Sequence, residues 1–146
     1  MRFWCLVLTL LTHPAFALDK ITDEAIKQFL SQQSTFIMQK EPEKLMALFA
    51  DNYQQIDKKQ QKTITKDELK TVYNSNFMVA KLIINTVKLT DSKIADDGVH
   101  AHINTHVFNR YLIEYAEKQN VLTQEEDWQS ELVLENGQLK YLKTEK

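Results

Sequence analysis

Histidine side chains are concentrated in one short stretch, VHAHINTHVF, at residues 99–108. Apolar and polar residues alternate there, as in a half-buried strand, and alternate side chains of a strand point to the same side about 6.6 Å apart. His100 and His102 could therefore bind one metal ion together, whereas His106 lies about 13 Å beyond His102. A zinc site would need a third ligand from a neighbouring strand. The alternatives are a polar outer face of a sheet and a contact that responds to pH.

The turn before this stretch predicts which face the histidines occupy. Residues 96–98, DDG, suit a three-residue hairpin loop with glycine in the left-handed conformation, so that Ala95 opposes Val99. This register gathers the apolar residues on one face and the histidines on the other. We therefore predict that the histidines lie on the outer face, and we expect His106 to meet Glu131 on the following strand. No metal ligand is assigned, and His100 and His102 remain the weak candidates.

The opposite, inner face of the same strand is expected to look toward the helices. An apolar cavity with a few convergent hydrogen-bonding groups is the usual form of a small-molecule site. The alternative is a plain core in which the polar tips of these residues reach backbone or water. The residues that could line a pocket are Tyr53, Tyr73, Asn85, Thr105, Asn109 and Trp128.

Three helical segments precede the strands. Thr22 is a plausible N-cap, and apolar residues recur at helical spacing from there to about Lys40. Pro42 suits the first turn of a second, short helix. The sequence TKDEL contains a capping box, with Thr65 as the cap and Glu68 three residues later, and it predicts a third helix.

After Ala80 the hydrophobic period changes from helical to alternating, which predicts four strands. Asn136 and Gly137 form the strongest two-residue hairpin signal in the chain. Helices followed by a long-stranded antiparallel sheet predict an α+β fold whose helices cover one sheet face. The four strand segments are LIINTVKLTDSKI, VHAHINTHVFNRYLIEY, VLTQEEDWQSELVL and LKYLKT.

This order of elements, with LMALFADNYQQID followed by TITKDEL, resembles the nuclear transport factor 2 superfamily. That superfamily includes ketosteroid isomerases, scytalone dehydratase and polyketide cyclases, and the resemblance covers residues 18–146. It implies a cone in which N-terminal helices pack on a curved, mainly antiparallel sheet around a pocket. Many members dimerise through the outer sheet face, so we expect a homodimer through the surface that carries Phe108 and Leu112.

Catalysis in this superfamily generally needs an ionisable group inside the cone. Asp91, opposite Ile103 in the predicted register, is the carboxylate expected to point inward, and Asp57 could reach the mouth. With Tyr53 or Tyr73 as hydrogen-bond donor, either would suit a small lyase or isomerase. However, an aspartate at a strand end more often serves a turn, and no histidine is directed inward as a general base. We therefore assign no catalytic residue and no cofactor, and favour a non-enzymatic domain.

The first residues have the layout of a secretory signal: Met1 and Arg2, an apolar run at residues 3–11, and the small-x-small site AFA at residues 15–17. We predict cleavage after Ala17 and a single domain at residues 18–146, which is periplasmic or secreted and is not inserted in a membrane. Cys5, the one cysteine, belongs to the apolar run.

Charge excludes two classes of partner. The whole chain has a formal net charge of −2. This charge does not suit a protein that binds nucleic acid or an anionic membrane surface. The expected partner is a small apolar ligand or another exported protein.

Overall fold

The computed structural model describes residues 17–115 and 118–146, so the predicted signal at residues 1–17, apart from Ala17, lies outside the described part of the chain. No helix in that described part is long and apolar enough to cross a membrane. In chain order the elements are α1 (Asp23–Met38), α2 (Pro42–Met46), β1 (Phe49–Asp57), β2 (Lys62–Thr65), α3 (Lys66–Val79), β3 (Ala80–Ile94), β4 (His100–Tyr115), β5 (Lys118–Glu135) and β6 (Gln138–Glu145).

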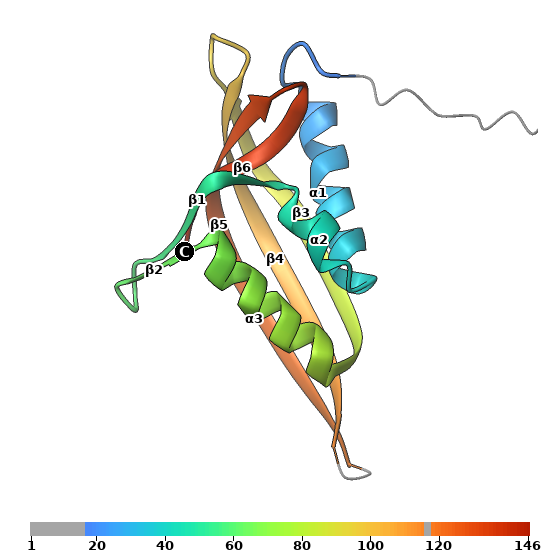
Figure 1. Ribbon diagram of the computed structural model, residues 1–146. Coiled ribbons are helices and arrows are strands. Elements are labelled where there is room, and N and C mark those ends of the chain that lie inside the picture. Colours follow the sequence, from blue (N-terminus) through green and yellow to red (C-terminus); the bar gives the residue numbers. More distant parts are fainter. Residues whose placement is uncertain (1–16, 116–117) are drawn as a thin grey trace, which may run out of the picture.

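The strands form one open, twisted sheet in the order β2-β1-β6-β5-β4-β3. The neighbours pair antiparallel except β1 and β6, which are parallel. The helices lie against one face of the long β3, β4 and β5 strands (Figure 1). The core lies between these layers, and Ile26, Leu45, Ile103 and Leu132 are among its fully buried side chains. The predicted α+β arrangement, with helices packed on a mainly antiparallel sheet, is confirmed.

Local sequence signals set the helix ends. The Thr22 hydroxyl accepts a hydrogen bond from the Ala25 amide at 3.1 Å, which caps α1 as predicted. At the start of α3 the Thr65 hydroxyl accepts from the Glu68 amide, and the Glu68 carboxylate accepts from the Thr65 amide at 2.7 Å. This capping box satisfies two amides that would otherwise lack partners at the helix end.

The two predicted hairpin turns are present with the expected backbone conformations. Asn136 and Gly137 have φ angles of 51° and 75°, and Gly98 has a φ angle of 71°. The turn at Gly98 is one residue longer than predicted, because the Ala95 amide donates to the carbonyl of His100 and not of Val99.

The predicted register between β3 and β4 holds only as far as Leu89, which lies opposite Thr105. A β-bulge at Thr90 then shifts the pairing by one residue, and such a shift moves side chains to the other face. Asp91 consequently lies opposite Asn104 on the outer face and is exposed. The prediction that Asp91 points inward is therefore wrong.

The register between β4 and β5 also differs from the prediction. His106 lies opposite Asp127 and not Glu131. The shift is four residues, an even number, so each side chain keeps its predicted face. His100, His102 and His106 lie on the outer face of β4, with buried Ala101 and Ile103 between them on the inner side.

Candidate functional site

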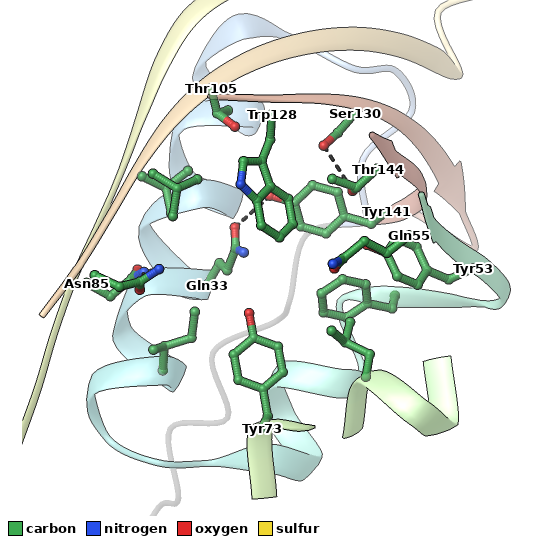
Figure 2. Close-up of a pocket in the computed structure, with 16 residues that line it drawn as sticks. Gln33, Tyr53, Gln55, Tyr73, Asn85, Thr105, Trp128, Ser130, Tyr141 and Thr144 are labelled. Carbon is green, nitrogen blue, oxygen red and sulfur yellow. Dashed lines mark hydrogen bonds between the residues drawn. The ribbon is translucent and has the colours of Figure 1, made fainter. Parts of the chain in front are cut away.

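The six residues predicted to line a pocket all lie around one cavity between the helices and the inner face of the sheet (Figure 2). They come from five elements: β1, β3, β4, β5 and α3. Sixteen residues line the cavity, and none of them is charged. Its volume is about 30 Å³, which is room for about one or two water molecules.

Asn85 and Asn109 form a polar pair across strands β3 and β4. The two residues are register partners, and Asn85 Nδ2 donates to Asn109 Oδ1 at 2.7 Å. Asn85 is only 4% exposed, and its own Oδ1 is buried without a hydrogen-bond partner. A buried carbonyl oxygen without a partner costs free energy, so it is an available acceptor for a ligand or a water molecule.

Tyr53 provides a second unpartnered group. It is 2% exposed, its ring packs edge-on against Phe49 at 4.7 Å, and its hydroxyl is buried without a hydrogen bond. Burial raises the pKa of Tyr53. The Thr144 hydroxyl lies near enough to lower this pKa in part, but it does not meet the geometry of a hydrogen bond with Tyr53. Thr144 pairs instead with Ser130, with 3.0 Å between the two hydroxyl oxygens.

Gln55 and Gln33 are cavity residues that sequence reasoning missed. Gln55 follows Tyr53 by two positions on β1, so strand alternation could have placed it on the same face; its Oε1 is buried and unpartnered. Gln33 comes from α1 and accepts a hydrogen bond from the Tyr141 hydroxyl at 2.6 Å (Figure 2). A lone glutamine in a helix carries no sequence signal that distinguishes it from a surface residue.

Tyr73 projects from α3, and its hydroxyl points into the cavity (Figure 2). Burial raises the pKa of Tyr73, and the neighbouring Tyr111, Tyr53 and Glu126 raise it further when charged. Tyr73 and Tyr53 therefore both keep their protons at neutral pH. Both can donate hydrogen bonds to a bound molecule.

A carboxylate that sequence reasoning also missed lies beside Trp128. Glu126 lies opposite Val107, which places it on the inner face of β5. Its Oε2 accepts a hydrogen bond from Trp128 Nε1 at 3.0 Å, and its Oε1 lies 2.9 Å from Lys146 Nζ. The Lys146 ammonium also lies 5.7 Å from the centre of the Trp128 ring. Neither Glu126 nor Lys146 lines the cavity itself.

The aspartates proposed as catalytic bases do not enter the cavity. Asp57 serves the turn after β1, because its Oδ1 accepts a hydrogen bond from the Gln60 amide at 2.9 Å. Its Oδ2 lies 3.7 Å from Lys146 Nζ. The Gln60 hydrogen bond is the largest cause of a lowered Asp57 pKa, and Lys146 adds to it. Asp57 is thus a turn residue beside Lys146, and Asp91 is on the other side of the sheet.

The three histidines of β4 do not share a common partner. His100 Nδ1 lies 2.7 Å from Asp97 Oδ2, and His106 Nδ1 lies 2.8 Å from Asp127 Oδ1. His102 is exposed between Lys93 and Glu131 on the neighbouring strands. Within residues 17–115 and 118–146, no three histidine, cysteine or acidic side chains converge to hold a metal ion.

No protein-family model matches this sequence, and no curated protein matches it. Solved structures match it in fold. A conserved protein from Planctomyces limnophilus has a TM-score of 0.74 at 13% identity, over 84% of this chain and 92% of that one. An NTF-2-like protein of unknown function from Shewanella oneidensis has 0.66 at 12% identity, over 84% and 95%. A ketosteroid isomerase-like protein from Erwinia carotovora atroseptica has 0.62 at 13% identity, over 84% and 92%. At such identities the likeness concerns the fold, and no activity follows from it.

Proposed function

The chain has the nuclear transport factor 2-like fold, and from the cavity inside that fold we propose that it is a non-enzymatic domain that binds a small, largely apolar ligand. The observation that carries this proposal is that three of the four buried side-chain atoms without partners in the described residues line this one cavity: Tyr53 Oη, Gln55 Oε1 and Asn85 Oδ1. A core built only for stability rarely leaves such atoms unpaired, because each costs free energy. A bound molecule would satisfy them.

A small lyase or isomerase is the alternative, and the site supports it less well. Such an enzyme needs an ionisable group that can reach a substrate in the cavity. Glu126 and Asp57 both lie near the Lys146 ammonium, and neither lines the cavity. The Gln60 amide and Lys146 lower the pKa of Asp57, which makes that carboxylate a weak proton acceptor.

We also propose that the domain acts outside the cytoplasm, after cleavage behind Ala17. The residue that follows the predicted cleavage site contacts the core. Leu18 packs against the core cluster, and its amide donates to the carbonyl of Gly137 at 3.0 Å. A processed domain would therefore keep the contacts of its first residue with the core.

Native mass spectrometry of the protein purified from its own host tests these proposals together. We expect a mass that begins at Leu18 and carries an additional non-covalent molecule. Asn85→Leu, which removes a buried acceptor, should reduce the bound fraction, and Asp91→Asn on the outer face is the matched control. Recovery of the bare chain alone would contradict the binding function, and a chain that keeps residues 1–17 would contradict processing.

A further inference from the structure

The cavity is smaller than its polar lining requires. A volume of about 30 Å³ accommodates water but no organic molecule. Yet the lining presents three unpartnered polar atoms, one of them the Tyr53 hydroxyl, together with the hydroxyl of Tyr73. An organic ligand could therefore enter this cavity only if a lining side chain moved.

Trp128 lines the cavity and also a second, more open pocket that Lys146 lines as well. Its side chain lines the cavity (Figure 2), while its indole N–H bonds Glu126 and its ring lies under Lys146. Glu126 and Lys146 are held to each other at 2.9 Å on the outside. The Trp128 indole thus contacts the cavity on one side and the Glu126–Lys146 ion pair on the other.

We infer that Trp128 is the lid of a site for a small uncharged molecule that carries a hydroxyl or amide group, and that Glu126 and Lys146 hold this lid shut. The inference rests on the proposed binding function and adds the class of ligand and the residues that control entry.

The lining sets the charge and shape of the ligand. Because none of the lining residues is charged, an ionic ligand would lose its hydration without gaining a counter-charge. The ring pairs Phe49–Tyr53 and Phe49–Tyr141, at 4.7 and 5.1 Å, form an aromatic wall. Such a wall favours a planar apolar group. The Tyr53, Gln55 and Asn85 polar atoms then require hydrogen-bonding groups on the same molecule.

The ion pair between Glu126 and Lys146 is weak enough to break when the lid opens. The side chains of Lys146 and Glu126 are 26% and 39% exposed, so water competes for their contacts. The backbone of Lys146 is fixed, because its amide donates to Ile56 and its carbonyl accepts from Lys58, both at 3.0 Å. The lid can therefore open through side-chain movement alone, without separating strands.

The lid is tested by the exchange of the Trp128 indole N–H with water, measured by NMR and assigned by its loss in Trp128→Phe. Glu126→Gln and Lys146→Met each remove the ion pair, and each should speed exchange by about two- to fivefold, as expected for an exposed pair. Lys140→Met breaks a different pair, Lys140–Glu135 at 3.2 Å, and should leave exchange unchanged. Exchange of the buried Leu132 amide, followed in the same spectra, separates lid opening from general destabilisation.

The ligand class is tested with four probes of similar size: benzyl alcohol, benzamide, benzoate and benzylammonium. The two uncharged probes should shift the Trp128 indole signal and bind about tenfold or more tightly than the two ions, because the cavity provides no counter-charge. Asn85→Leu should weaken benzamide binding. Equal binding of the ions would overturn the ligand class.

The lid and the ligand class can each be wrong while the proposed binding function is right. If a ligand is recovered from the host protein but Glu126→Gln and Lys146→Met leave indole exchange unchanged, the lid is wrong and the binding function stands. If exchange accelerates but no probe binds the parent protein or either variant, the uncharged class is wrong and the lid stands.

Discussion

Trp128 Nε1 donates a hydrogen bond to Oε2 of Glu126, two residues earlier on β5, at 3.0 Å. Alternate residues of a strand share a face, so the indole that lines the cavity and the carboxylate that holds it are adjacent on the inner side. Lys146 then bonds the other oxygen of Glu126. One strand thus supplies both the wall of the cavity and its connection to the surface.

Tyr53→Phe should stabilise the ligand-free protein. The variant removes a buried hydroxyl that has no partner, so the free energy of unfolding should rise by about 1 kcal/mol. Tyr141→Phe is the matched control, because its hydroxyl donates to Gln33 at 2.6 Å; its loss should lower the free energy of unfolding by about 1 kcal/mol. Urea denaturation measures both. Destabilisation by Tyr53→Phe would show that the hydroxyl is already paired.

Thr65→Ala should weaken the start of α3. The Thr65 hydroxyl accepts from the Glu68 amide in the capping box, and losing such a cap costs about 1 kcal/mol of unfolding free energy. Thr71→Ala in the same helix is the control. Its hydroxyl bonds only the Asp67 carbonyl one turn earlier, and alanine is the better helix former, so stability should be unchanged or slightly higher. Equal losses for the two variants would contradict the capping role.

The ionisation of Glu145 should make the free energy of unfolding depend on pH in the acid range. Lys143, and then Lys58, hold its pKa at about 2, below the ordinary value of 4.5. A carboxyl with a lowered pKa in the folded state stabilises the fold above the unfolded pKa. This contribution is lost as the pH falls from about 4.5 toward 2. Urea denaturation across this range should show a weaker pH dependence for Glu145→Gln. The double variant Lys58→Met with Lys143→Met should show the same weakening, and an unaltered profile in both would contradict the ion pairs.

The outer face should mediate a homodimer, as the fold resemblance implies. Phe108 and Leu112 share this face with exposed Leu82, Ile84 and Val121 on the flanking strands. Light scattering should give a mass near twice that of one chain. Phe108→Asp should reduce it, while Asn104→Asp farther along β4 should not. A strictly monomeric parent protein would contradict the interface.

Strand alternation gives the face of those predicted pocket residues that lie on strands, whereas Tyr73 comes from α3. Thr105 and Asn109 have the same parity on β4, and their partners on β3 and β5 follow from antiparallel pairing. The hairpin glycines were equally accessible to sequence reasoning, because Gly98 and Gly137 occupy positions with positive φ.

The errors have a common physical cause, which is that register depends on tertiary structure. The bulge at Thr90 contains no glycine or proline from which the sequence could predict it, and it moves Asp91 to the outer face. Glu126 on β5 contacts Lys146, the residue after β6. The pairing of β5 with β6 ends at Gln129 and Glu145, before either residue is reached. Contacts beyond the end of a ladder cannot be derived from alternation.

A crystal structure of the protein purified from its own host tests the central claim most directly. We predict electron density for an uncharged non-protein molecule in the cavity, bonded to Asn85 Oδ1 and the Tyr53 hydroxyl, with the Trp128 indole displaced from its position in Figure 2. A cavity that contains only water, with Trp128 still bonded to Glu126, would contradict it.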